Sequence, residues 1–288
     1  MQKSEELISV IMPTFNEESY LQEAISSVLD QTYSNIELII VDNMSIDNTL
    51  EIIKANKSID SRIKYNTCDV KGPAAVRNRA ISMASGDYIV NMDADDIIHK
   101  DRIEKLFCEC KKYSKAIIGS NVSIINKDKK QKKDLVYPNE NNKIRKFFSR
   151  PFNRSAIMPG TIMAHKKVFK QFPYNEKFIY LSDWDFILRA SMDEELIFYN
   201  VQEILYYYRL NENSLTFNYK ERNKYNVLIL INYFLMIRER NTFESLEHIE
   251  REFSNNILLK LIYNFLLILK YLQHNTWIII TKVLIDKE

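Results

Sequence analysis

The sequence has few glycines and few cysteines, and each shortage excludes a class of site. With 4 Gly among 288 residues, the chain cannot form a glycine-rich phosphate-binding loop, so any phosphate must be held in another way. Cys68, Cys108 and Cys110 are too few for a disulfide framework, and the last two lack a second pair that would complete a zinc site. We therefore expect reduced thiols in a cytosolic protein.

The chain also lacks a net charge of consequence and a clear targeting segment. Its 40 basic and 38 acidic residues leave a formal charge of +2. Nucleic-acid binding needs a strong basic surface, so it is not expected as the main task. Residues 1–6 are polar and acidic, which predicts no secretory signal.

One apolar run ends in three carboxylates and is the most informative stretch. Residues 88–92 have the pattern of a buried strand, and Asp93, Asp95 and Asp96 follow directly. Like charges this close repel each other unless a positive group lies between them. Because Mg²⁺ and Mn²⁺ prefer oxygen ligands, the stretch predicts a metal site with phosphate as a second ligand. The alternative is a solvated turn that caps the next helix.

Strands and helices alternate along the first 120 residues. Strands are expected at 7–12, 36–41, 62–66, 88–92 and 116–119, and helices at 21–29, 48–55, 74–84 and 101–113. This alternation predicts an α/β fold with a doubly wound, mostly parallel sheet. Polar segments 13–18, 42–47 and 93–96 follow strand ends, so they should converge on one rim of the sheet.

The second half of the chain is less regular and ends in apolar helices. Short strands are expected at 162–164 and 204–209, and a helix begins near residue 181. We divide the chain into residues 1–120, 121–218 and a C-terminal helical extension, 219–288. Apolar faces edged by Lys, Tyr and Trp277 favour contact of that extension with a membrane surface. The alternative is packing against the domain or a second subunit, as in a homodimer.

Four segments, 13–18, 41–49, 72–78 and 86–96, together resemble the family 2 glycosyltransferases. They read Pro-Thr-Phe-Asn-Glu-Glu, Val-Asp-Asn-Met-Ser-Ile-Asp-Asn-Thr, Gly-Pro-Ala-Ala-Val-Arg-Asn and a final Asp-Ala-Asp-Asp. The resemblance is collinear over residues 7–120 and thinner through 183–185 and 208–216. It implies the Rossmann-like GT-A fold, in enzymes of the type that build bacterial surface polysaccharides such as lipopolysaccharide and capsule.

The resemblance implies transfer of a sugar from a nucleotide diphosphate donor, usually UDP, with Mn²⁺ or Mg²⁺. Asp42 would bind the pyrimidine, Arg77 the base or the diphosphate, and Asp93 the ribose. Asp95 would hold the metal, with Asp93 and Asp96 as further candidates. The full set expected to bind the nucleotide sugar is Pro13, Thr14, Asn16, Glu18, Asp42, Arg77, Asp93 and Ala94. Segments 69–75 and 158–161 are expected to line the sugar pocket.

The acceptor hydroxyl needs a general base. In the family, this base is an acid in a motif like Glu-Asp-Trp at the start of a helix. The sequence here reads Ser182-Asp183-Trp184, so Asp183 is the matching position. The alternative role of Asp183 is plain helix capping, and Asp185 is the substitute base. The resemblance implies inversion at the anomeric carbon.

Three positions depart from the family pattern. Asn43 and Met44 replace an acid and a glycine, so the loop lacks glycine's easy access to positive φ, a region that Asn tolerates. Asn211 stands where the family often has a histidine near the diphosphate.

Two other functions remain open from the sequence. One is a haloacid-dehalogenase-type phosphohydrolase, which also places Asp-x-Asp after a strand, although on an earlier one. The other is a non-catalytic partner that binds a sugar nucleotide. For the glycosyltransferase, we expect a glycan or lipid-linked glycan acceptor and a cytoplasmic location, peripheral to the inner face of the cell membrane.

Overall fold

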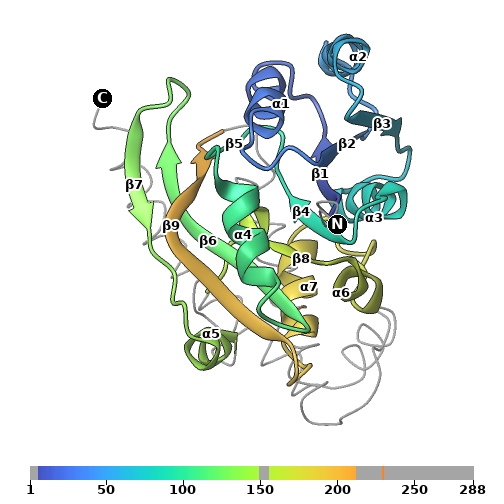
Figure 1. Ribbon diagram of the computed structural model, residues 1–288. Coiled ribbons are helices and arrows are strands. Elements are labelled where there is room, and N and C mark those ends of the chain that lie inside the picture. Colours follow the sequence, from blue (N-terminus) through green and yellow to red (C-terminus); the bar gives the residue numbers. More distant parts are fainter. Residues whose placement is uncertain (1–5, 149–155, 212–228, 230–288) are drawn as a thin grey trace, which may run out of the picture. The chain divides into compact units, whose positions relative to one another are not determined.

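The computed structural model describes residues 6–148, 156–211 and 229. The part up to Asn211 is one compact unit. Its described residues build a nine-stranded sheet in the order β3-β2-β1-β4-β8-β6-β9-β5, with β7 paired to β6 (Figure 1). The α/β architecture expected from the alternation of strands and helices is confirmed.

The first four strands are parallel and are joined by helices. The strands are β1 (Ile8–Thr14), β2 (Ile36–Asp42), β3 (Ile63–Thr67) and β4 (Tyr88–Asn91). The helices are α1 (Leu21–Leu29), α2 (Thr49–Ile59) and α3 (Pro73–Met83). Every residue of β2 is buried, as expected for a parallel strand that helices cover on both faces.

The remaining strands continue the same sheet with mixed directions. They are β5 (Ile97–Ile98), β6 (Ala116–Ile125), β7 (Gln131–Leu135), β8 (Met163–His165) and β9 (Ile197–Arg209). β8 is antiparallel to both β4 and β6, whereas β6 and β9 are parallel. The helices here are α4 (Arg102–Cys110), α5 (Asn141–Phe148), η1 (Pro159–Thr161), α6 (Lys166–Gln171) and α7 (Ser182–Ala190).

Two strands differ in length from the sequence expectation. β6 runs on to Ile125 and therefore crosses residue 120, so the expected segments 1–120 and 121–218 share one sheet. β9 begins at Ile197 rather than near 204, and its register shifts where it passes Ser120 to Val122 of β6. A bulged strand of this kind loses the regular alternation on which sequence reasoning depends.

Helices cover both faces of the sheet. Alternate residues of β1, Ile8, Val10 and Met12, join a core cluster with α1 and α4, while α3 packs against β1 and β2. In Figure 1, α4 lies in front of β6 and β9 and α7 lies behind the sheet. The carboxyl ends of β1, β2 and β4 meet on one rim, as the strand pairing requires.

The expected C-terminal extension, 219–288, lies outside the described residues apart from Ile229. In the part of the chain that the structure does describe, no helix has the length and apolar character needed to cross a membrane.

Candidate active site

The chain turns sharply after β4 and presents its acids there. The strand stops at Asn91, and Asp96 N–H donates to Asp93 O at 3.3 Å to close the turn. Asp96 is fully buried, and its Oδ1 accepts from the Arg209 backbone N–H at 2.7 Å. Burial, reinforced by the carboxylates of Asp95 and Asp93, raises the pKa of Asp96 well above its ordinary value. This buried position suits support of the turn better than direct contact with a ligand.

Three carboxyl groups crowd the open side of this turn. Burial raises the pKa of Asp95 to about 6, with a further contribution from Asp93. Burial, with the charges of Asp95 and Asp93, raises the pKa of Glu17 to about 8. Glu17 follows β1 and Asp95 follows β4, so neighbouring strand ends bring these groups together. Two of these acids therefore hold their protons more tightly than isolated acids do, and a bound cation would relieve the same crowding.

Sequence reasoning passed over Glu17 and selected its neighbours, Asn16 and Glu18. Asn16 has a left-handed φ of 55°, and its Oδ1 accepts from Ile46 N–H at 2.9 Å. Glu18 is exposed and accepts from the N–H and the amide of Asn48 at the start of α2. The reversal at Asn16 turns Glu17 toward the acids, and no periodic pattern encodes that reversal.

A buried guanidinium fixes the turn from the opposite half of the unit. Arg209, at the end of β9, is 1% exposed. Its Nε donates to Asp95 O at 2.8 Å and its Nη2 to Glu23 Oε2 at 2.7 Å. Asn211 stands where the family that the motifs resemble often has a histidine. Its Nδ2 donates to Asp95 Oδ2 at 3.3 Å.

A second guanidinium holds the turn against η1. Arg102 is fully buried, and its Nη2 donates to Asn91 O and to Gly160 O, both at 2.9 Å. A Cβ placed on Gly160 would lie 2.9 Å from Asp93 Oδ2 and 2.8 Å from the Tyr206 hydroxyl. Glycine therefore allows the backbone of η1 to approach the Asp93 carboxylate, consistent with the expectation that segment 158–161 lines the site.

Arg77 joins the acidic turn to the expected base. Its Nη2 lies 3.0 Å from Asp93 Oδ1, and its guanidinium covers the ring of Tyr174 at 5.6 Å. Burial opposes the charge on Arg77, but Asp93, and more weakly Asp183, hold its pKa above the ordinary value. The charge of Asp183 therefore acts on Arg77, as that of Asp93 does. These two acids are 90 residues apart in the sequence.

Asp183 and Asp185 lie in the first turn of α7 in different surroundings. Asp183 is half-buried, and its Oδ1 accepts from the N–H of Trp184 at 2.8 Å. Asp185 is 2% exposed and pairs with Arg189 Nε at 2.8 Å, while burial raises its pKa to about 6. The ion pair occupies Asp185, so Asp183 is the better placed of the two to meet a substrate. The residue preceding α7 is Leu181, so Asp183 is not its N-cap.

The loop after β2 is built around Asp42. Asp42 is 1% exposed, its Oδ1 accepts from the hydroxyls of Thr14 and Ser45, and its Oδ2 accepts from Ser45 N–H at 3.0 Å. Contact with a base would use the lone pairs that remain on this carboxylate. Met44 takes the glycine position of the family motif with a positive φ of 61°, so a side chain here accepts a strained backbone.

The predicted nucleotide-sugar residues are only partly brought together. Arg77 and Asp93 are in contact, and Thr14 and Asp42 are hydrogen-bonded. Pro13 lies half-buried in β1 beside Thr14, whereas Ala94 is 4% exposed and packs into the core.

A divalent cation fits the donor chemistry of this turn. Within the described residues, no group of three or more His, Cys, Asp or Glu side chains is arranged as a complete metal centre. The crowded carboxyl groups of Asp95, Asp93 and Glu17 nevertheless offer hard oxygen donors, and phosphate oxygens supply the rest of such a shell in many Mg²⁺ sites.

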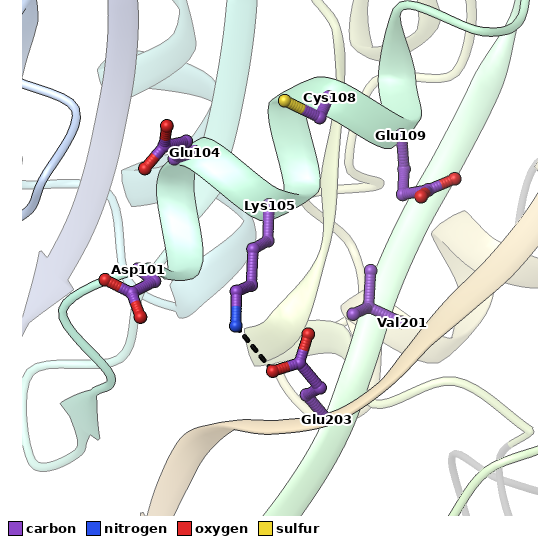
Figure 2. Close-up of a pocket in the computed structure, with 7 residues that line it drawn as sticks. All are labelled: Asp101, Glu104, Lys105, Cys108, Glu109, Val201 and Glu203. Carbon is purple, nitrogen blue, oxygen red and sulfur yellow. Dashed lines mark hydrogen bonds and ion pairs between the residues drawn. The ribbon is translucent and has the colours of Figure 1, made fainter.

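A separate groove lies between α4 and β9. Figure 2 shows it lined mainly by acidic side chains, with Lys105 Nζ 2.5 Å from Glu203 Oε2. None of the predicted site residues lines this groove, so we do not assign the active site to it.

Comparison with known sequences identifies the architecture around the acidic turn. The sequence profile of glycosyl transferase family 2 matches residues 9–172, which include β1, the Asp42 loop, Arg77 and the acidic turn. The chain belongs to glycosyl transferase family 2. The family membership expected from the four motifs is therefore confirmed, while the phosphohydrolase alternative loses its basis.

Relatives of this family 2 member differ in how much of the chain they match. An uncharacterized glycosyltransferase of Methanocaldococcus jannaschii is 30% identical over 97% of this chain and 93% of its own length. The Escherichia coli UDP-Glc:alpha-D-GlcNAc-diphosphoundecaprenol beta-1,3-glucosyltransferase WfgD is 32% identical over 74% of this chain and 80% of its own length. The chain spans about two fifths of the length of matched glycosyltransferases from Haemophilus influenzae and Streptococcus pneumoniae.

Solved structures confirm the GT-A fold of this family 2 member. S. aureus TarS 1-349 in complex with UDP-GlcNAc gives a TM-score of 0.60 at 19% identity, covering 86% of this chain and 72% of that one. The mannosyltransferase PcManGT from Pyrobaculum calidifontis, in complex with GDP-Man and Mn²⁺, gives 0.59 at 15% identity, covering 92% and 72%.

The raised pKa of Glu17 predicts a pH-dependent loss of stability. Because the pKa of about 8 in the folded state exceeds the value of 4.5 for an isolated Glu, the folded protein keeps a proton that the unfolded chain has lost. Stability therefore falls as pH rises from about 5 to about 8. Glu17→Gln mimics the protonated form, and since the site is only half-buried we expect a gain of about 1–2 kcal/mol at pH 8.5 and almost none at pH 5.

Urea unfolding at the two pH values measures this difference. Glu51→Gln, an exposed Glu→Gln change at the start of α2, is the matched control and should leave the pH dependence as in the wild type. If Glu17→Gln and Glu51→Gln show the same stability difference from wild type at both pH values, the crowding of Glu17 by the two aspartates is refuted.

Proposed function

We propose that the chain is an inverting, metal-assisted glycosyltransferase that transfers a sugar from a nucleotide diphosphate donor. The favoured donor is a UDP-sugar, and the acceptor is a hydroxyl of a glycan or lipid-linked glycan. One observation carries the proposal: Arg77 contacts Asp93 at 3.0 Å and is also within the electrostatic reach of Asp183. A candidate donor-binding carboxylate is thus paired with Arg77, and a candidate base stabilises the charge on the same guanidinium.

On the donor side, the residues of the rim divide the nucleotide between them. Asp42 and Thr14, joined by a 3.3 Å hydrogen bond, would receive the base at the ends of β1 and β2. Asp93 would accept hydrogen bonds from the ribose hydroxyls. Arg77 would bind the diphosphate, since a guanidinium offers paired donors suited to phosphate oxygens. When the donor binds, Arg77 would either leave Asp93 for the diphosphate or contact both groups at once.

On the acceptor side, Asp183 would act as the general base. As the acceptor oxygen attacks the anomeric carbon, the carboxylate takes the hydroxyl proton. The new carbon–oxygen bond forms as the bond from that carbon to the diphosphate oxygen breaks, and the electron pair leaves with the nucleoside diphosphate. A single displacement of this kind inverts the anomeric centre. Asp185 is buried in its ion pair with Arg189, so Asp183 is the carboxylate of this helix turn that can reach an acceptor.

Asp95, with Asp93 and Glu17 beside it, would hold Mn²⁺ or Mg²⁺. When bound, such an ion neutralises the charge that develops on the leaving diphosphate. Asp96 and Arg209 would hold the turn from beneath, through the 2.7 Å bond between the Arg209 N–H and Asp96 Oδ1.

The comparisons support this choice of substrates. The E. coli relative is named for transfer from UDP-Glc to a diphosphoundecaprenol-linked sugar, and a Bacillus subtilis relative is named as a putative teichuronic acid biosynthesis enzyme. The structural neighbours were solved with UDP-GlcNAc or with GDP-Man and Mn²⁺. Together they favour UDP-sugars, a divalent metal and a role in polysaccharide biosynthesis.

A lipid-linked acceptor would place the enzyme at the inner face of the cell membrane. We assign that contact to residues 219–288, whose sequence alternates apolar stretches with Lys and Tyr. A chain that ends near residue 255 should then partition less into membrane vesicles than the full chain. Equal partition of the two would remove the extension from this role.

The function is tested by a hydrolysis and transfer screen over nucleotide sugars, with and without Mn²⁺. We expect release of UDP from one or a few UDP-sugars, and loss of turnover on chelation. Asp183→Asn should reduce transfer by about 10²-fold or more, because the base is removed while donor binding is kept. Glu194→Gln, at an exposed acid beyond the same helix, should leave transfer unchanged.

Two other outcomes would indicate a different function, and a third would remove one residue from its proposed role. Phosphate release from a generic phosphoester, undiminished in Asp183→Asn, would indicate a phosphohydrolase. UDP binding without turnover, even with cell-derived lipid acceptors, would indicate a non-catalytic partner. Metal-independent turnover would remove Asp95 from its role as a metal ligand.

A further inference from the structure

A short segment, Pro173–Tyr174, connects the helix that carries the donor-binding Arg77 with the helix that carries Asp183. Tyr174 follows α6 and is 2% exposed. Its backbone forms a reciprocal pair with Asn78 of α3: Tyr174 N–H donates to Asn78 Oδ1 at 3.0 Å, and Asn78 Nδ2 donates to Tyr174 O at 2.8 Å. The same Nδ2 also donates to Glu176 Oε1 at 2.8 Å. One amide side chain thus fixes the backbone at Tyr174.

The side chain of Tyr174 touches both halves of the site. Its ring lies beneath the Arg77 guanidinium at 5.6 Å and against the ring of Phe186 in α7 at 5.0 Å. Its hydroxyl accepts from Asn91 Nδ2 at 2.9 Å, two residues before Asp93. Burial raises the pKa of Tyr174 to about 12, so this hydroxyl stays neutral at working pH.

Helix α7 holds the segment from the other side. Arg189 Nη2 donates to Pro173 O at 2.5 Å, and Arg189 Nε pairs with Asp185. Phe186 and Asp183 are three residues apart, so they lie on the same face of α7. The segment Pro173–Tyr174 is therefore held by both α3 and α7, and it supports the direct contact between these two helices.

We propose that Asn78 and Tyr174 are positioning residues that set the location of the Asp183 carboxylate relative to the donor held by Arg77 and Asp93. The inference rests on the proposed function, because it requires Asp183 to act on an acceptor at the anomeric carbon. Neither residue reacts; each acts through the segment that it holds.

This role predicts a separation of catalysis from donor binding. The proposed donor ligands, Asp42, Arg77 and Asp93, lie on elements before residue 120, and their hydrogen bonds and ion pair do not include Asn78. Arg77 does lie over the ring of Tyr174, and Tyr174→Phe keeps that ring. A displaced base, by contrast, loses its alignment with the acceptor oxygen, and a shift of about 1 Å in a reacting group can cost about 10²-fold in rate.

The test is Asn78→Asp, which keeps the size of the side chain. The change retains an oxygen for Tyr174 N–H but replaces the donor amide with a second oxygen, which then faces Tyr174 O and the Glu176 carboxylate. We expect kcat for sugar transfer to fall by about tenfold or more, while the Kd for UDP, measured by calorimetry, changes by less than about twofold. Tyr174→Phe removes only the bond to Asn91 and should lower kcat by a smaller factor, with the same unchanged Kd.

Exchanging the hydrogen-bond donor and acceptor between positions 78 and 176 should restore part of the lost activity. Adding Glu176→Gln to Asn78→Asp offers an amide donor to the new carboxylate and should recover part of kcat. The matched control is Asn56→Asp: Asn56 Nδ2 also donates to one side chain, Gln22, and one backbone oxygen, Ile52 O, but does so between α1 and α2 away from Asp183. It should leave both kcat and Kd unchanged.

The outcomes distinguish a failure of the proposed function from a failure of the positioning role. A wild-type enzyme that binds UDP but turns over no sugar nucleotide contradicts the proposed function itself. A wild-type enzyme that transfers sugar, with Asn78→Asp and Tyr174→Phe at the same kcat, contradicts only the positioning role. The role is also overturned if Asn78→Asp loses UDP affinity in proportion to kcat, or if Asn56→Asp shows an equal loss. Should Asn78→Asp fail to fold, Tyr174→Phe decides alone.

Discussion

The repulsion among carboxyl groups at the ends of β1 and β4 is the constraint on which the rest of the site depends. Burial raises the pKa values of both Asp95 and Glu17, Asp93 adds to both shifts, and Asp95 adds to that of Glu17. The fold tolerates them by surrounding the turn with guanidinium groups: Arg77 on the open side, and Arg102 and Arg209 buried behind it. A cation bound beside Asp95 would relieve the remaining crowding and would offset the charge of a bound diphosphate.

The mixed direction of the sheet brings the second set of groups to the same place. β8 runs antiparallel to β4, so η1, just before β8, lies beside the acidic turn, and α7 follows on the face that α3 also covers. A purely parallel continuation would have carried the chain away from the rim before Asp183. The parallel strands therefore supply the donor side, and the antiparallel step returns the chain with the acceptor side.

Most of the parallel half was predictable, because apolar strands and amphipathic helices leave regular patterns; α1 begins and β2 starts where the spacing placed them. The sequence placed Asp93 and Arg77 on one rim of the sheet, where the structure brings them into contact, whereas the choice of Asp183 rested on the family resemblance. Glu17 was missed because its direction depends on a left-handed Asn16, and Tyr174 because a buried tyrosine in an irregular segment looks like ordinary core. The start of β9 was misplaced because a bulge interrupts its alternation.

The most direct test of this account is a calorimetric titration of Mn²⁺ into the UDP-saturated protein at pH 7, repeated in buffers of different ionisation enthalpy. With the pKa of Glu17 near 8, the site is protonated before the metal enters. Metal binding should therefore release protons, and Glu17→Gln should release fewer. Binding of Mn²⁺ with no proton release, or no binding in the presence of UDP, would contradict the account.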